Sequence, residues 1–158
     1  LEGEGRFTRF LREKALDAGI VLDVAMECST WTQVIDAMRE RKWGRILQIS
    51  SINGQKGQYG QANYAASKAG MHGFTISLAQ ENARFGITVN TISPGYIATD
   101  MVMAVPEEVR AKIVVNIPTG RLGTPEEIAY AVSFFMPDEA AWITGANLSV
   151  NGGHYMGW

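Results

Sequence analysis

The sequence is poor in the residues that form disulfides and metal sites, with one cysteine, Cys28, and two histidines, His72 and His154, among 158 residues. A single cysteine cannot form a disulfide within the chain, so we expect a reducing compartment, the cytoplasm. The two histidines are too few and too far apart in the sequence to suggest a metal cluster, so no metal ion is expected.

Excess positive charge and long apolar runs are also absent. Lysine plus arginine total 14 against 16 aspartate plus glutamate, and the formal net charge of -2 offers no basic surface for nucleic acid or an anionic membrane. No apolar run approaches the roughly 20 residues that span a bilayer, and residues 1–7 lack the form of a secretory signal. The remaining composition, 46% hydrophobic and 19% charged, is typical of one globular domain.

The apolar pattern predicts an order of helices and strands in the first half of the chain. Apolar residues three to four apart predict helices over 7–16 and 20–41, where the pattern is least regular. A short β-branched run at 44–50 predicts a buried strand. A loop rich in glycine and glutamine follows at 53–61, and a proline-free stretch predicts a helix over 62–85.

The second half of the chain adds further strands. A β-branched run at 86–93 predicts a strand, so strand, helix and strand form a βαβ unit of a parallel sheet. A last strand is expected over 143–150. We therefore expect an α/β fold with three strands, around Ile46, Val89 and Leu148, and helices on both faces of the sheet.

One more helix carries a clear start signal. Thr124 is followed by Pro125 and by Glu127, which predicts a capping box with proline at the first helical position. The helix is expected over 125–136.

Three polar residues lie where they can act on one ligand. Tyr64 and Lys68 are four residues apart near the start of the helix expected over 62–85, so both side chains rise from one face. A nearby ammonium group favours the ionised form of a phenol, which lets a tyrosine exchange a proton near neutral pH. Ser51 follows the strand at 44–50, at the edge of a parallel sheet where ligands bind, and its hydroxyl can hold a carbonyl oxygen. A tyrosine and a lysine at this spacing are common on helices, but in this context they suit reduction of a carbonyl by a hydride from a nicotinamide.

Four longer segments occur in a characteristic order with these residues. They are residues 63–70 (Asn-Tyr-Ala-Ala-Ser-Lys-Ala-Gly), 89–95 (Val-Asn-Thr-Ile-Ser-Pro-Gly), 121–129 (Arg-Leu-Gly-Thr-Pro-Glu-Glu-Ile-Ala) and 144–153, which begins with Thr-Gly and ends with Asn-Gly-Gly. Together with Ser51 they resemble the short-chain dehydrogenase/reductase family, from Gly44 to the last residue. The resemblance implies a Rossmann-like, doubly wound parallel sheet, and Ser51, Tyr64 and Lys68 as the catalytic residues.

The resemblance also implies a substrate and a cofactor. Residues 53–61 and 94–102 look most like the members of the family that reduce acetoacetyl-CoA, a 3-oxoacyl-CoA, with NADPH in polyhydroxybutyrate synthesis. The members that reduce 3-oxoacyl groups on the acyl carrier protein of fatty acid synthesis are the alternative.

Two sets of binding residues follow from the same resemblance. NADPH would contact Tyr64, Lys68, Pro94, Gly95, Tyr96, Ile97 and Thr99. The acyl-CoA thioester would contact Ser51, Gln58, Tyr59, Gly60, Gln61 and Tyr96, because neutral amides and an aromatic ring can grip a thioester without placing a charge on its carbonyl. The alternative for Gln58 and Gln61 is a loop exposed to solvent.

Members of the family begin with a strand, a glycine-rich turn and a helix that bind the cofactor pyrophosphate, and this sequence shows none of them. Gly3 and Gly5 follow no strand, so they are poor candidates for that turn. The resemblance therefore implies that residues 1–158 are a single partial domain, lacking the N-terminal strands and the Gly-rich cofactor turn. By itself the chain is expected to bind NADPH very weakly and to show no turnover.

The helix over 62–85 resembles the helix that pairs subunits in the family, which implies a homo-oligomer. An alternative to the enzyme is a non-enzymatic remnant that keeps the oligomer-forming helices and binds no nucleotide.

Overall fold

The computed structural model describes residues 20–23 and 28–157, with side chains from residue 34 onward. In chain order the elements are β1 (Ile20–Asp23), α2 (Cys28–Arg41), β2 (Gly44–Ile49), α3 (Ile52–Lys56), α4 (Ala62–Asn82), η1 (Ala83–Phe85), β3 (Ile87–Pro94), α5 (Asp100–Met103), α6 (Glu107–Val114), α7 (Pro125–Phe134), η2 (Asp138–Ala140) and β4 (Asn147–Val150). The helix expected over 7–16 lies outside the described residues.

The described strands form one parallel sheet in the order β1-β2-β3-β4. The strands expected over 44–50 and 86–93 are confirmed as β2 and β3. The strand expected over 143–150 is confirmed in its second half, as β4. The α/β class with a parallel sheet is therefore confirmed.

The start of the helix expected over 20–41 is wrong. Ile20–Asp23 is strand β1, paired in parallel with β2, and only Cys28–Arg41 is helical. A short apolar run such as Ile-Val-Leu fits a strand and a helix equally well by its pattern. The neighbouring strand decides between them, because it offers a ladder of backbone hydrogen bonds.

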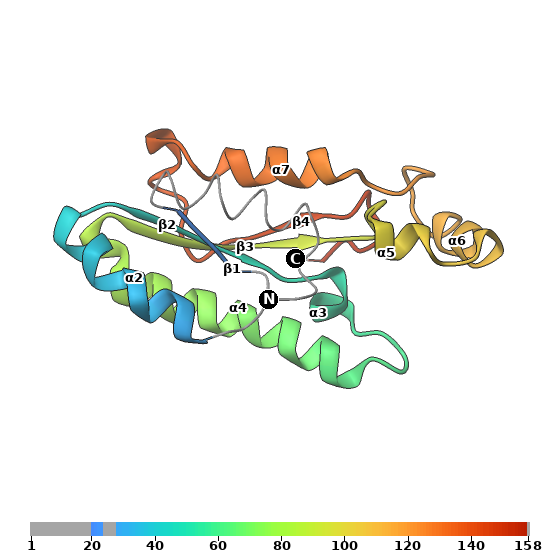
Figure 1. Cartoon of the computed structure of the whole chain (residues 1–158), viewed down its shortest axis with the longest axis horizontal. Helices are drawn as coiled ribbons and strands as arrows, with labels where there is room; N and C mark the ends of the chain where they lie inside the picture. The colour runs from blue at the N-terminus through green and yellow to red at the C-terminus, as the bar shows by residue number, and fades with distance from the viewer. Residues whose placement is uncertain (1–19, 24–27, 158) are drawn as a thin grey trace.

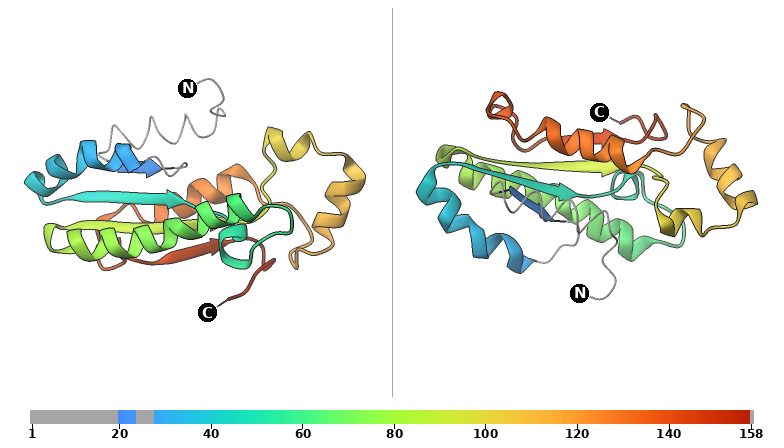
Figure 2. Two further views of the ribbon diagram at one scale, coloured as in Figure 1. Left: turned by 90° about the horizontal axis from the view of Figure 1, so that it is seen from below. Right: turned by 45° about the horizontal axis from the view of Figure 1, so that its top comes forward.

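Helices cover both faces of the sheet, α2 and α4 on one and α7 on the other (Figure 1). The first face is closed by buried Ile35, Met38, Ile46, Leu78, Ala79, Ile87 and Val89. The second is closed by buried Leu47, Ile92, Ala131, Val132 and Phe135. Neighbouring strand residues such as Ile46 and Leu47 face opposite sides, as the pleat requires. The helices α5 and α6 lie beyond the carboxyl ends of the strands (Figures 1 and 2).

The capping box expected at Thr124 is confirmed. The Thr124 side chain accepts a hydrogen bond from the Glu127 backbone, and the Glu127 side chain accepts one from the Thr124 backbone. Arg121 donates two hydrogen bonds to the same carboxylate, at 2.9 and 2.6 Å. These bonds, first those from Arg121 and then that from the Thr124 backbone, lower the pKa of Glu127 to about 2. The helix starts at Pro125 as expected and ends at Phe134.

The loop expected over 53–61 contains a short helix, α3, so the expectation is wrong for its first residues. Ser51 caps the helix, because its Oγ accepts a hydrogen bond of 3.1 Å from the Asn53 backbone. Gly57 ends it with a φ of 71, a conformation that favours glycine. A helix of five residues is too short to show an apolar pattern in the sequence. The capping residue Ser51 was therefore the one local feature that could have predicted it. The helix expected over 62–85 is confirmed as α4 and η1.

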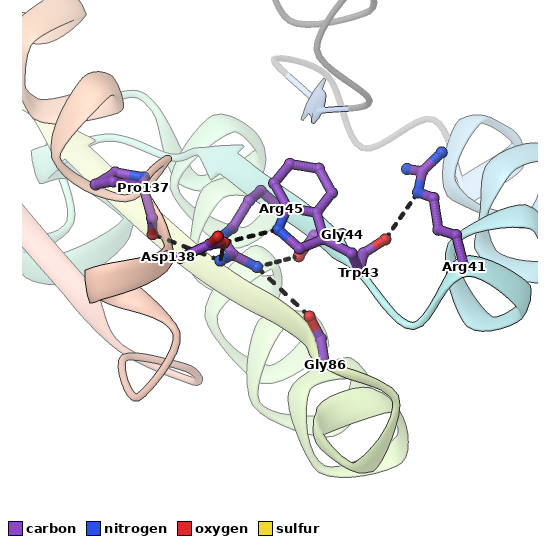
Figure 3. A network of polar contacts seen from close by, with 7 residues as sticks. All are labelled: Arg41, Trp43, Gly44, Arg45, Gly86, Pro137 and Asp138. Carbon is purple, nitrogen blue, oxygen red and sulfur yellow. Dashed lines mark hydrogen bonds and ion pairs between the residues drawn. The ribbon is translucent and has the colours of Figure 1, made fainter.

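A buried arginine joins the amino ends of β2 and β3 to the turn before β4 (Figure 3). Arg45 is 1% exposed, and its guanidinium lies 3.2 Å from the carboxylate of Asp138. It also donates to the carbonyl oxygens of Gly44 and Gly86, at 3.0 and 3.4 Å. Trp43 donates to the same Asp138 oxygen at 2.9 Å and stacks under the guanidinium. This network closes the end of the sheet opposite to α3, α5 and α6.

In the described part of the chain, no helix is long and apolar enough to cross a membrane. The same residues contain no cluster of three or more histidine, cysteine, aspartate or glutamate side chains that could hold a metal ion.

Candidate active site

Ser51 lies at the carboxyl end of β2, where it caps α3. The residue is 9% exposed, and its oxygen accepts the hydrogen bond from Asn53. A hydroxyl that accepts one hydrogen bond still has its own hydrogen to donate. Ser51 can therefore donate to an oxygen atom of a ligand, from a position fixed by the helix cap.

Tyr64 and Lys68 lie one turn apart at the start of α4. The Lys68 ammonium group donates a hydrogen bond of 2.8 Å to the carbonyl oxygen of Ile49, and it lies 5.9 Å from the centre of the Tyr64 ring. Tyr64 is 43% exposed, so a ligand can reach it. The lysine places a positive charge beside the phenol, as the spacing in the sequence predicts.

The first half of α4 is held in place by a close main-chain contact with α3 and by a hydrogen bond from the end of β2. A Cβ atom at Gly54 would lie 2.8 Å from the carbonyl carbon of Lys68 and 2.9 Å from the backbone nitrogen of Ala69. Ser50 also donates a hydrogen bond of 2.8 Å to the Lys68 carbonyl. A larger residue at Gly54 would push α4, and with it Lys68, away from α3.

The segment after β3 forms the other wall of the site. A Cβ atom at Gly95 would lie 2.9 Å from the Cα of Asn151, so only glycine allows this close passage beside the end of β4. Ile97 then pairs with Gly123 in a short parallel bridge. These contacts hold the turn after β3 against the loop before α7.

These walls surround a cavity of about 560 Å³ at the carboxyl ends of β2 and β3. The residues expected to be catalytic or to bind the nicotinamide all line it, namely Ser51, Tyr64, Lys68, Pro94, Gly95, Tyr96, Ile97 and Thr99. Gln61, one of the residues expected at the thioester, also lines the cavity.

Asn53, Met101 and Val102 line the same cavity, although the sequence assigned no binding or catalytic role to any of them. Asn53 is 7% exposed and donates a hydrogen bond of 2.8 Å to the Gln61 side chain. Its Oδ1 atom is buried and has no hydrogen-bond partner among the described residues. Buried carbonyl oxygens are rarely left without a donor, so this atom can accept a hydrogen bond from a ligand. The position of Asn53 two residues after Ser51 was the feature of the sequence that could have indicated its place in the site.

Gln58, Tyr59 and Gly60 do not line this cavity. Gln58 lines a neighbouring cavity of about 530 Å³, which shares Tyr96 with the first one. Tyr59 is fully exposed and Gly60 is exposed as well. The structure therefore brings Gln61 to the expected catalytic residues and places the rest of this loop outside them.

His72 lies beneath the site, between α4 and the strands. Its Nε2 atom is 3.1 Å from the hydroxyl of Ser50 and 3.4 Å from that of Ser93. Both hydroxyls donate their own hydrogens elsewhere, to Lys68 and to Asn147, so the imidazole N–H is the donor in these contacts. Burial lowers the pKa of His72 below its ordinary value, which favours the neutral ring.

Comparison with known proteins shows what the chain resembles. A family model described as Enoyl-(Acyl carrier protein) reductase matches residues 10–155. An acetoacetyl-CoA reductase of Cupriavidus necator is 55% identical over 141 residues, which cover 89% of this chain and 57% of that protein. A 3-oxoacyl-(acyl-carrier-protein) reductase of Escherichia coli is 54% identical over 123 residues, which cover 78% of this chain and 50% of that protein.

A solved structure has the same fold. The crystal structure of a 3-oxoacyl-(acyl-carrier protein) reductase from Brucella melitensis matches with a TM-score of 0.76 and 37% identity, over 81% of this chain and 48% of that one. The chain thus spans about half the length of the relatives that it matches.

Proposed function

The chain belongs to the short-chain dehydrogenase/reductase family, and we propose that it carries the catalytic part of an NADPH-dependent oxidoreductase that reduces acetoacetyl-CoA to the 3-hydroxyacyl-CoA. This is a reaction of polyhydroxybutyrate synthesis. The observation that carries the proposal is the cavity at the carboxyl ends of β2 and β3, which Ser51, Tyr64 and Lys68 line together.

In the proposed reaction Tyr64 is the general acid. Its hydroxyl gives a proton to the oxygen of the 3-oxo group when the carbon of that group accepts a hydride. Lys68 holds its positive charge near the Tyr64 ring, from a position fixed by the Ile49 carbonyl, where it stabilises the negative charge left on the tyrosine oxygen after the proton has moved to the substrate. Ser51 donates its hydroxyl hydrogen to the same substrate oxygen and stabilises the negative charge that develops there.

NADPH would supply the hydride. The cavity fits a nicotinamide ring with its carboxamide, because it combines apolar walls from Ile49 and Ile97 with the unpartnered acceptor of Asn53. The ring would lie against Pro94, Gly95, Tyr96, Ile97 and Thr99, and Tyr64 and Lys68 would hold the attached ribose.

The acyl thioester would enter past the loop between α3 and α4. Gln61 lines the catalytic cavity, where it can contact the acyl group, and Ser51 and Tyr96 can contact it there too. Gln58, Tyr59 and Gly60 would contact a more distant part of the substrate. The alternative substrate is the same acyl group on an acyl carrier protein, and similarity to the reductases of Escherichia coli and Brucella melitensis favours it.

We further propose that residues 1–158 form one partial domain that pairs with other copies through α4. The support is a line of exposed small residues along that helix. They are Ala66, Ser67, Ala69, Gly70, Gly73 and Ser77. Exposed Ile76 adds an apolar contact on the same helix, and small residues let two helices approach closely. The alternative is a non-enzymatic remnant that keeps this surface and binds no nucleotide.

Hydride transfer tests the proposal. The 158-residue chain is compared with a fusion protein. In the fusion, the N-terminal part of the Cupriavidus necator reductase, up to its equivalent of Gly44, precedes Gly44 of this chain. The chain alone is expected to bind NADPH very weakly and to show no turnover, because charge-assisted hydrogen bonds to a pyrophosphate are worth roughly 1.5–3 kcal/mol each and the glycine-rich turn that makes them is not in the sequence. The fusion is expected to oxidise NADPH when acetoacetyl-CoA is added.

Assays with acetoacetyl-CoA and with acetoacetyl-carrier protein distinguish the two proposed substrates. Turnover with acetoacetyl-CoA above that with acetoacetyl-carrier protein supports the main proposal, and the reverse order selects the alternative substrate. A folded fusion that binds NADPH but reduces neither thioester would overturn the assignment as a reductase. Micromolar NADPH binding and turnover by the chain alone would show that the missing turn is not needed.

A further inference from the structure

The second cavity lies beside the proposed active site, and Tyr96 borders both. Its walls come from the end of α3, from α6 and from the turn after β4, which lie at one end of the sheet (Figure 2). The lining residues are Lys56, Gln58, Tyr96, Val109, Lys112, Ile113, Asn116 and His154. Four of them, Val109, Lys112, Ile113 and Asn116, form one face of α6 and of the turn that follows it, because residues three or four apart lie on the same side of a helix.

The lining has positive charge and no negative charge. Lys56 and Lys112 contribute two cations, and none of the lining residues is acidic. Neither ammonium group forms an ion pair or a hydrogen bond with another described residue. Glu108 lies one turn before Lys112 on α6 but is not part of the lining. Two unpaired cations beside one hollow attract an anion more strongly than either does alone.

Two neutral polar groups add hydrogen-bonding capacity. The Nδ1 atom of His154 is buried and has no partner in the part of the chain that the structure describes. Burial, and then the charge of Lys56, lower the pKa of His154, so its ring is neutral near pH 7. Asn116 donates to the Lys112 carbonyl through Nδ2, which leaves its side-chain oxygen as an acceptor.

The ring of Tyr96 joins the two cavities. It stacks on His154 with the ring centres 5.7 Å apart, so the aromatic side chain has a fixed position between the catalytic residues and the lysines. A ligand that reaches from one cavity to the other must pass this ring.

We propose that the second cavity binds the phosphate group of a phosphopantetheine chain, with Lys56 and Lys112 as its cationic ligands. The inference rests on the proposed function, which places the thioester end of the same molecule in the catalytic cavity. Phosphopantetheine has a neutral chain with two amide groups between its sulfur and its phosphate. Tyr96, Gln58, Val109 and Ile113 suit that neutral chain, and the two lysines suit its charged end.

Binding to the 158-residue chain tests the proposal without any turnover. The ligands are 4′-phosphopantetheine, coenzyme A, and pantetheine, which lacks phosphate, each followed by NMR titration. The variants are Lys56→Gln, Lys112→Gln and the double substitution. Lys42→Gln is the matched control, because Lys42 is an exposed lysine before β2, at the other end of the sheet.

We expect each single substitution to weaken 4′-phosphopantetheine binding about three- to fivefold, and the double substitution to weaken it about tenfold or more. The affinity for pantetheine and the affinities of the Lys42 variant should not change. Losses of equal size for pantetheine would overturn the proposal, because the lysines would then act through the fold. Equal losses in the Lys42 variant, no loss in any variant, or no binding by the unsubstituted chain would overturn it as well.

The phosphate can come from coenzyme A or from an acyl carrier protein. The same titration with holo- and apo-carrier protein separates these sources, because only the holo form carries the phosphopantetheine. Affinity lost for coenzyme A and not for holo-carrier protein identifies coenzyme A as the ligand, and loss for both shows that the shared phosphate is recognised on either molecule. If the fusion is an active reductase but the lysine substitutions leave phosphopantetheine affinity unchanged, only the phosphate site is refuted. If the fusion is inactive but the two lysines bind the phosphate, only the proposed function is refuted.

Discussion

The ammonium group of Lys68 donates a hydrogen bond of 2.8 Å to the carbonyl oxygen of Ile49, the last residue of β2. This bond ties the start of α4 to the carboxyl end of the sheet. It also gives a long, flexible side chain one position, with its nitrogen 5.9 Å from the centre of the Tyr64 ring. The charge that the proposed chemistry needs is therefore held by the backbone of a neighbouring strand.

Replacing Tyr64 by phenylalanine removes the proposed proton donor and keeps the ring. We expect turnover of the fusion with acetoacetyl-CoA to fall by about two to four orders of magnitude, the usual contribution of general acid catalysis. Tyr130→Phe is the matched control, since Tyr130 is an exposed tyrosine on α7, outside the catalytic cavity. A Tyr64→Phe variant within tenfold of the unsubstituted fusion would exclude the assigned role.

Removing the carboxylate of Asp138 leaves Arg45 buried without its counter-ion. The Arg45 side chain is 2% exposed, and that of Asp138 is 83% exposed, so solvent screens part of the interaction. We expect Asp138→Ala to lower the free energy of unfolding by about 1–3 kcal/mol, measured by urea denaturation. Asp36→Ala is the control, because Asp36 pairs with Arg39 on the surface of α2 at 3.6 Å. Equal effects of the two substitutions would show that the burial of Arg45 is unimportant.

Thr124→Ala removes one half of the capping box of α7. The substitution should destabilise the protein by about 1 kcal/mol, as the loss of a threonine cap generally does. Thr99 offers a comparison, because it precedes α5 as its N-cap residue but makes no side-chain cap hydrogen bond. Thr99→Ala should change the thermal midpoint much less than Thr124→Ala, and the opposite order would contradict the assignment of the cap.

His72 predicts a dependence of stability on pH. Burial lowers its pKa below the ordinary 6.5, so between the two values the unfolded chain binds more protons than the folded one. The contribution of His72 to stability is therefore complete above about pH 6.5 and is lost as the pH falls through the folded pKa. His72→Gln should flatten the plot of unfolding free energy against pH in this window. His154, whose pKa is lowered by burial and by Lys56, should keep part of the slope. A variant as steep as the unsubstituted chain would contradict the prediction.

The sequence by itself determined the elements whose signals are local. The β-branched runs of β2 and β3, the proline-free stretch of α4 and the capping box at Thr124 all act within a few residues, and the structure contains each of them. The spacing of Tyr64 and Lys68 on one helix face is equally local, because one turn of helix sets it.

Only the tertiary structure decided the rest. Ile20–Asp23 forms a strand because β2 lies beside it. The helices α5 and α6 were not predicted, because their sequences show no clear helical pattern. Arg45 and Asp138 are 93 residues apart, and the two lysines of the second cavity lie on separate helices. Such contacts form when distant segments meet at the same end of the sheet. Their energy depends on burial and on partners that no short stretch of sequence contains.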